Sequence, residues 1–308
     1  MSVIKLAIVA LVLLISWTAP ARSQAPEPRY EATMELVGLV EDAVDLVESE
    51  GVEAACGSFR TAGSRWLEGD SYVFVVGMDG KALCHPARPT LEGQYLNELK
   101  DPKGRPILAN MLREVEESDE GWVHYQWPRP GEQIFRWKTT YVRTAVDPAG
   151  ARVMVSSGRY QMEVEPFFIV EQVEDAVELI LSEGEEPAFT AFRDPRSGYL
   201  FYTAYVFVLD EDGVLLVNNA FPENEGRDLS GLADIDGRLF VQEMLQVPVH
   251  RSAWIHYKWP KPGDERPSAK SSFVRRIDVD GRQLVVGSGV YFDQEPDVRV
   301  LGPKPDVD

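Results

Sequence analysis

Apolar and polar positions follow two periods along this chain, and the same succession occurs twice. Between residues 36 and 47 apolar side chains recur every three or four positions with acidic residues between them, and the run ends at Gly51. This spacing predicts an amphipathic helix with one buried stripe. Residues 173–181 repeat the pattern and end at Gly184. A second helix of the same kind is therefore expected.

Strand patterns follow each predicted helix. In the first half, segments rich in aromatic and β-branched side chains occupy residues 72–76, 81–84, 122–127, 138–144 and 152–156. In the second half, residues 205–209 and 214–217 flank the turn Asp212-Gly213, which is typical of a hairpin. One long helix followed by about five antiparallel strands predicts an α+β unit with the helix packed on one face of the sheet. The long segment between the second and third strands is expected to cover the other face.

The two halves are copies of one unit. LVEDAVDLVESEG at 39–51 matches QVEDAVELILSEG at 172–184 in nine of thirteen positions, and YVFVVGMDG at 72–80 matches YVFVLDEDG at 205–213. GWVHYQWPRPG at 121–131 likewise matches AWIHYKWPKPG at 253–263. A period of roughly 130 residues is long enough for each copy to be a domain. We therefore expect one domain at 30–163 and another at 164–293.

The N-terminal residues 1–25 have the pattern of a secretory signal peptide. Lys5 precedes an apolar run from Leu6 to Trp17, and small and polar residues follow. This run is shorter than the roughly 20 residues that span a bilayer. We expect cleavage, which gives a periplasmic or secreted protein; an uncleaved anchor is the alternative. Residues 294–308 are expected to form a mobile acidic tail.

The net charge limits the choice of partners. It is -19, with 50 acidic against 31 basic residues, and it opposes binding to nucleic acid or to anionic lipid. It does not exclude a small anion, because one buried cation acts locally. The two cysteines, Cys56 and Cys84, could form a disulfide in an oxidising compartment. They do not supply the four ligands of a zinc site, and we expect neither a metal nor a cofactor.

The order of the motifs resembles that of single-Cache-type domains, the PAS-like extracytoplasmic sensor domains of bacterial chemoreceptors and histidine kinases. The resemblance rests on the Tyr-Val-Phe-Val strand, His85-Pro86, the Trp-containing segment 121–130, Lys138 and the final Gly-x-Tyr, and it extends over residues 30–292. It implies two tandem PAS-like Cache domains. Each would have a pocket for a small organic ligand, often a carboxylate or an amino-acid-like compound.

The chain departs from this family pattern in two respects. The second copy has Asn218 and Asn219 where the first has His85 and Pro86, so the two pockets are expected to differ in ligand, or one to have lost binding. Neither copy is followed by a transmembrane-length segment or a signalling domain. We therefore expect a bound state to be read by a membrane partner, such as a histidine kinase, a chemoreceptor or a transporter.

The candidate ligand-binding residues lie on or beside the predicted strands. Aromatic rings such as Tyr125 and Trp127 give apolar walls with a polar edge, although they could equally be plain core residues. Lys138 and Lys270 would need an anion if they were buried, whereas from an edge strand they would reach water. His85 could donate a hydrogen bond to the same anion. The candidate set is Trp66, Tyr72, His85, Tyr125, Trp127, Lys138, Tyr205, Asn218, Tyr257, Trp259 and Lys270.

The sequence favours binding over catalysis. It contains no GxSxG, HExxH or phosphate-loop motif, so we expect no catalytic residues and no enzyme activity. His124 and His256, beside the strand tryptophans, are expected to be exposed polar positions. The hypothesis is an exported ligand-binding sensor. The alternative is an interaction or structural module of the cell envelope, with pockets filled by the protein's own side chains.

Overall fold

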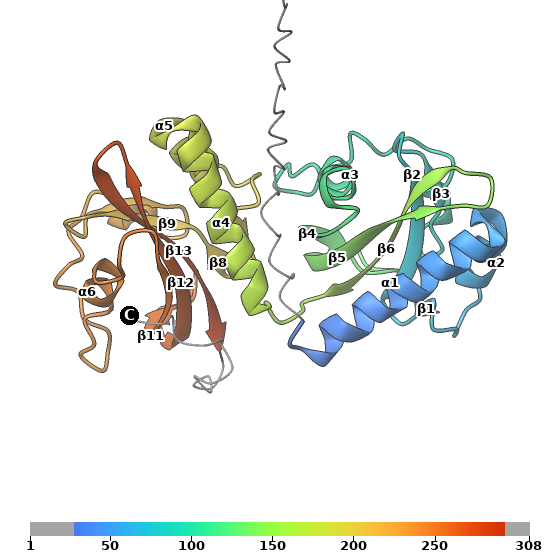
Figure 1. Ribbon diagram of the computed structural model, residues 1–308. Helices are drawn as coiled ribbons and strands as arrows, with labels where there is room; N and C mark the ends of the chain where they lie inside the picture. The colour runs from blue at the N-terminus through green and yellow to red at the C-terminus, as the bar shows by residue number, and fades with distance from the viewer. Residues whose placement is uncertain (1–27, 293–308) are drawn as a thin grey trace, which may run out of the picture.

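The computed structural model describes residues 28–292, so the predicted signal peptide and acidic tail lie outside the described residues. These residues form two lobes of the same design, one from α1 to β6 and one from α4 to β13 (Figure 1). Among the helices of the described part, none is long and apolar enough to cross a membrane. The two lobes have the α+β architecture that the repeat predicted, with a long helix packed on an antiparallel sheet.

The first lobe consists of one sheet between two helical layers. Its sheet has the order β3-β2-β6-β5-β4, with the short β1 also paired to β2, and all neighbours are antiparallel. Helix α1 contacts β5 and β6, and α3 contacts β4 and β5 from the other face (Figure 1). The elements are α1 (Glu31–Glu50), α2 (Val52–Phe59), β1 (Leu67–Glu68), β2 (Ser71–Gly77), β3 (Ala82–Cys84), η1 (Pro89–Leu91), α3 (Ile107–Ser118), β4 (Glu120–Pro128), β5 (Phe135–Val146) and β6 (Arg152–Tyr160).

The second lobe repeats this order. Its sheet runs β10-β9-β13-β12-β11, and α4 packs against β12 and β13. The elements are α4 (Pro166–Glu183), α5 (Glu185–Arg193), β7 (Leu200–Phe201), β8 (Ala204–Tyr205), β9 (Phe207–Asp210), β10 (Leu215–Asn218), η2 (Pro222–Asn224), α6 (Phe240–Leu245), β11 (Ser252–Pro260), β12 (Pro267–Val279) and β13 (Arg282–Phe292).

Strand alternation divides each core into two layers. On β2, Val73 and Val75 face α1, whereas Tyr72, Phe74 and Val76 face α3 and the loops before it. The segment 85–119 supplies this second cover, as the sequence predicted. Every other residue of the central strands therefore points into the layer between the sheet and α3, which contains the cavity described below.

The sequence did not predict the short helices α2 and α5. Each follows directly on the long helix of its lobe, after a glycine with positive φ, 84° at Gly51 and 87° at Gly184. The predicted strand 205–209 is also interrupted at Val206, giving β8 and β9. Periodicity identified the long helices, whereas a helix of eight or nine residues has too few turns to reveal its period.

The two lobes pack through the outer strands of the first sheet, and α4 stands between the two sheets in Figure 1. His124 is packed between Phe168 and Phe201, with ring centroids 4.6 and 4.2 Å away. Its expected exposure was wrong, because α4 and β7 cover this part of β4. Burial lowers the pKa of His124 to about 3, so the ring is neutral. The Tyr202 hydroxyl hydrogen-bonds Thr139 Oγ1 at 3.1 Å across the same contact.

Candidate ligand-binding site

The layer between the first sheet and α3 contains a cavity of about 30 Å³. Its wall is almost wholly apolar and aromatic, and no Asp or Glu lines it. The lining residues are Tyr72, Phe74, Val76, His85, Leu91, Leu96, Leu99, Ile107, Leu108, Met111, Tyr125 and Trp127. A space of this size holds about one water molecule. A larger ligand would therefore have to move the cover formed by residues 91–107 outward.

Lys138 lies beside this cavity with a fully buried side chain. Its Nζ is 3.9 Å from the ring centroid of Tyr72, 5.1 Å from that of Tyr160 and 5.9 Å from that of Phe74. Among the described residues no group accepts a hydrogen bond from this amine. Burial lowers its pKa to about 7. An unpaired buried amine is costly, and a carboxylate supplied from outside would both neutralise it and accept its hydrogen bonds.

Two further donors come from the turn after β3. His85 packs against Tyr72 and Phe74, and its Nδ1 accepts a hydrogen bond of 3.1 Å from the Arg88 backbone N–H. Burial, with repulsion from Lys138 next, lowers the pKa of His85 to about 4, so the neutral ring carries its proton on Nε2. The Arg88 guanidinium carbon is 4.9 Å from the Trp127 ring centroid. Arg88 was not among the predicted site residues.

In the second lobe the matching lysine, Lys270, has a hydrogen-bond partner. Lys270 is buried, and its Nζ donates a hydrogen bond of 2.8 Å to the Tyr205 hydroxyl. Tyr291 lies beside them, with its ring centroid 5.0 Å from Nζ and its hydroxyl 3.3 Å from that of Tyr205. Burial lowers the pKa of Lys270 well below its ordinary value. This amine therefore has a hydrogen-bond partner, whereas Lys138 has none among residues 28–292.

Larger side chains also fill the space in the second lobe. Phe221 occupies the position of Arg88 and lies against Tyr205 and Trp259, with centroids 5.6 and 6.3 Å away. Phe240 occupies the position of Ile107 and stacks on Tyr257 at 4.1 Å. Two aromatic rings thus stand where the first lobe has an arginine and a smaller aliphatic side chain.

The structure brings most of the predicted site residues together, five in each lobe. Tyr72, His85, Tyr125, Trp127 and Lys138 meet at the first cavity, and Tyr205, Asn218, Tyr257, Trp259 and Lys270 occupy the matching places in the second lobe. Trp66 does not join them. It packs on Phe59 at 5.3 Å, on the α1 side of the sheet and away from the cavity.

The sequence contained a signal for the residues that were missed. Tyr72, Phe74, Trp127 and Lys138 have identical counterparts in the second copy, whereas Arg88 and Ile107 are replaced by phenylalanine. A comparison of the two copies position by position identifies these as the places where the pockets differ. Tyr160, paired with Lys138 across β5 and β6, belongs to the matched Gly-x-Tyr motif.

Comparisons with known proteins point to one family. A family model described as Cache domain matches residues 61–166 and 169–298. The methyl-accepting chemotaxis protein McpP of Pseudomonas putida is 33% identical over 107 residues, which are 35% of this chain and 19% of that protein. The chain thus matches less than a fifth of the length of this curated relative.

Solved structures that match the chain include a periplasmic sensor domain of a chemotaxis protein. It is 27% identical, with 42% of this chain and 91% of that chain covered and a TM-score of 0.34. A Cache chemosensory domain described for carboxylic acid recognition is 26% identical, with 42% and 89% covered and a TM-score of 0.34. The ligand-binding domain of the Pseudomonas fluorescens chemoreceptor CtaA with L-isoleucine is 11% identical, with 85% of both chains covered and a TM-score of 0.32.

Proposed function

Because the chain belongs to the Cache domain family, we propose that it is an extracytoplasmic sensor whose first lobe binds a small carboxylate. The observation that carries the proposal is the fully buried, unpaired amine of Lys138 beside an apolar cavity. The carboxylate accepts hydrogen bonds from Lys138, with Arg88 and His85 as further donors. The short hydrocarbon part occupies the cavity.

The charges around the cavity favour a carboxylate without an amino group. Lys138 and Arg88 are basic, and no acidic side chain is among the described residues that line the wall. Asp70, the carboxylate whose charge acts on Lys138, is paired with Arg129 at 2.9 Å. The small volume of the cavity, about 30 Å³, also favours the shortest carboxylates, because each further methylene moves more of the cover. We therefore place amino acids second to simple carboxylates.

A thermal-shift series tests this proposal. Acetate, propionate and butyrate are compared with glycine and alanine, using the mature protein. A ligand at 100 times its dissociation constant stabilises the fold by about 2.7 kcal/mol, which raises Tm by a few degrees in a protein of this size. Arg88→Ala is expected to weaken binding about tenfold, as loss of one charged hydrogen bond. No shift with any carboxylate would reject the proposal.

Gly158 offers a matched test of the position of Lys138. A Cβ at Gly158 would lie 2.7 Å from Lys138 Cε and would also clash with Thr140 Oγ1. A Cβ at Gly289 would meet the matching atoms, Lys270 Cε at 2.7 Å and Ser272 Oγ at 2.5 Å. Each Gly→Ala change is expected to cost about 1–3 kcal/mol of stability through overpacking. Only Gly158→Ala should weaken carboxylate binding, measured by isothermal calorimetry. Equal losses of affinity in the two variants would argue against a ligand site restricted to the first lobe.

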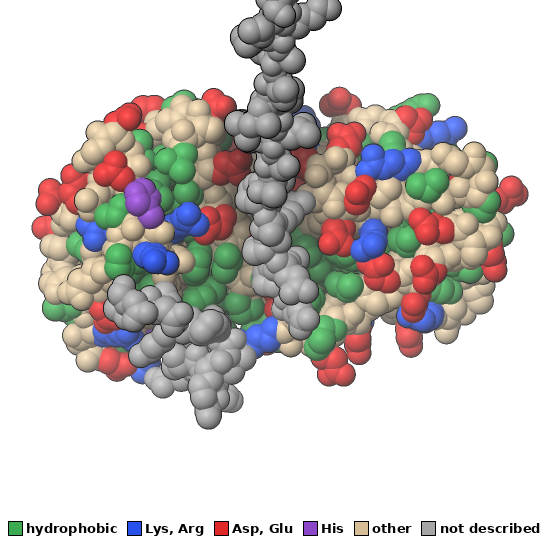
Figure 2. Space-filling model, viewed as in Figure 1, with side chains coloured by type: hydrophobic (Ala, Val, Ile, Leu, Met, Phe, Trp, Pro, Cys, Tyr) green, Lys and Arg blue, Asp and Glu red, His purple; other side chains and the backbone are tan. Residues whose placement is uncertain are grey.

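We propose that the second lobe is structural and contacts the partner that reads the bound state. The hydrogen bond of Lys270 and the two additional rings of Phe221 and Phe240 support this division of roles. The two domains would then extend over residues 30–163 and 164–293. The disulfide between Cys56 and Cys84 supports an oxidising compartment such as the periplasm. Acidic side chains are spread over the visible face of both lobes (Figure 2), which supports a protein partner rather than a nucleic acid. No catalytic role is proposed.

A further inference from the structure

The turn that carries His85 and Arg88 is anchored to the preceding helix in both lobes. We call residues 85–88, and 218–221 in the second lobe, the rim. Glu92 accepts a hydrogen bond of 2.8 Å from the His85 N–H and pairs with Arg60 at 2.7 Å. Glu225 does the same for the Asn218 N–H, at 2.8 Å, and pairs with Arg193 at 3.0 Å. This anchor is common to both lobes.

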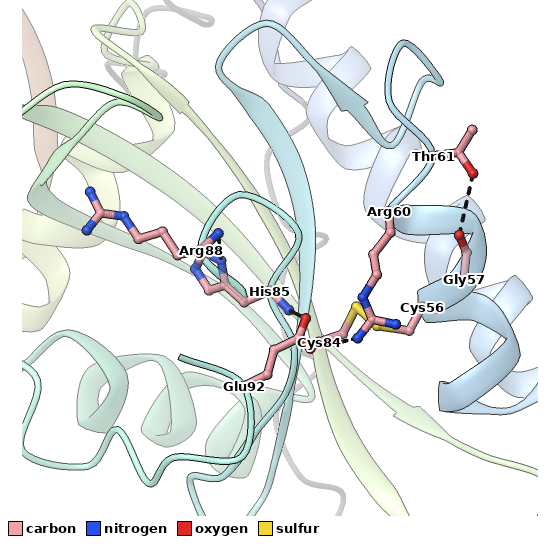
Figure 3. Close-up of a disulfide and its surroundings, with 8 residues drawn as sticks. All are labelled: Cys56, Gly57, Arg60, Thr61, Cys84, His85, Arg88 and Glu92. Atoms are coloured by element: carbon pink, nitrogen blue, oxygen red, sulfur yellow. Dashed lines mark hydrogen bonds and ion pairs between the residues drawn. A yellow bond between two sulfur atoms is a disulfide. The ribbon is translucent and has the colours of Figure 1, made fainter. Parts of the chain in front are cut away.

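A second anchor differs between the lobes. In the first, a disulfide joins Cys56 of α2 to Cys84, the last residue of β3 and the neighbour of His85 (Figure 3). In the second, the corresponding residues are Phe189 and Val217, both within the apolar core. There the Asn219 side-chain amide instead donates a hydrogen bond of 2.6 Å to the Phe192 carbonyl of α5. The first lobe has Pro86 at that position and lacks this donor.

The second lobe therefore acts as an internal control. It has the same sheet and the same helix pair without a disulfide, so the fold of this unit does not require the covalent bond. The disulfide occurs in the lobe in which one rim residue, His85, lines a cavity. β3 has three residues, and Ala82 at its start also exchanges backbone hydrogen bonds with residues 93–94. Cys84 at its end has Val75 of β2 as its strand partner.

We propose that the Cys56–Cys84 disulfide positions the rim, holding His85 and Arg88 where they contact the ligand. This inference rests on the proposed binding of a carboxylate in the first lobe. Figure 3 places His85 directly after the disulfide-bonded Cys84, with Arg88 extending away from the sulfurs. Without the covalent bond, the end of β3 is held by the pairing of Cys84 with Val75, by the packing of His85 on Tyr72 and Phe74, and by the Glu92 anchor, with no link to α2 at Cys84. Residues 85–88 then adopt several conformations, only one of which binds the carboxylate.

The test uses a double variant that copies the second lobe, Cys56→Phe with Cys84→Val. Acetate binding is measured by calorimetry at low temperature, and folding by circular dichroism. We expect affinity about tenfold weaker, since a rim that is competent about a tenth of the time reduces apparent affinity by that fraction. The nitrogen signals of the His85 ring should also broaden or shift in the ligand-free variant, which a purely stabilising disulfide would not cause.

A rescue and a control complete the test. Adding Pro86→Asn supplies a donor for the Phe59 carbonyl, as Asn219 does for Phe192, and should restore affinity to within about threefold of the wild type. Asn219→Ala should leave acetate binding unchanged. Wild-type affinity in the double variant, or unaltered His85 signals, would overturn the inference. A wild-type protein that binds no carboxylate would instead reject the proposed function, and the His85 signals would still decide the role of the disulfide.

Discussion

Lys138→Met is expected to weaken carboxylate binding roughly 100-fold while leaving the empty protein at least as stable as the wild type. The wild-type amine is buried without a hydrogen-bond acceptor among the described residues, so an apolar side chain of similar length removes an unfavourable group. Removing one partner of a buried charge pair costs about 3 kcal/mol, which weakens binding roughly 100-fold. Calorimetry with acetate and thermal unfolding measure the two effects.

Lys270→Met provides the matched control. It removes a lysine of equal burial that already donates to Tyr205, so acetate affinity is expected to stay within twofold of the wild type. Normal acetate binding by Lys138→Met would show that Lys138 does not bind the carboxylate. An equal loss of binding in Lys270→Met would show that the effect is not specific to the first lobe. A destabilised Lys138→Met protein would also contradict it, because the amine would then have a structural role.

Ligand affinity should decrease as the pH rises above neutrality. The pKa of Lys138 in the empty protein is about 7 because of burial, and a bound carboxylate favours the protonated amine. Affinity is therefore expected to be nearly constant from about pH 5.5 to 6.5 and to weaken about tenfold per pH unit above 7. His85, with a pKa of about 4, stays neutral throughout this range.

Proton uptake measures this linkage directly. Calorimetry in buffers of different ionisation enthalpy should give uptake of about half a proton at pH 7 and nearly one at pH 8. The lowered pKa also makes Lys138 unfavourable for folding below pH 7, an effect that disappears as the pH approaches the unfolded value of 10.5. The stability advantage of Lys138→Met should decline over the same interval. Affinity independent of pH would show that Lys138 keeps its proton when the site is empty.

The repeat and the periodicity were sufficient to predict the architecture. Leu36, Leu39 and Val40 form part of the buried stripe of α1, and the central strands appear within a few residues of their predicted bounds. Both lysines were identified as candidates because a cation in an apolar strand needs an explanation. Their burial required the structure, since alternation alone does not distinguish a covered sheet face from an exposed edge.

The remaining features depend on contacts between distant residues. His124 is covered because Phe168 and Phe201, more than forty positions later, pack on it. The disulfide was left open by the sequence, because two cysteines 28 residues apart pair only if α2 and β3 meet. The surroundings of Lys138 and Lys270 also differ, because Arg88 and Ile107 of the first lobe are replaced by Phe221 and Phe240. The periodicity of one strand or helix does not show which distant residues contact it.

A crystal structure of the protein grown with propionate tests most directly whether the first lobe binds a carboxylate at Lys138. We expect a carboxylate within hydrogen-bond distance of Lys138 Nζ, beside His85 and Arg88, with the cover of residues 91–107 displaced outward. We expect no propionate beside Lys270. Propionate bound beside Lys270 would contradict a site restricted to the first lobe. A Lys138 amine without propionate beside it at saturating concentration would contradict the proposed site itself.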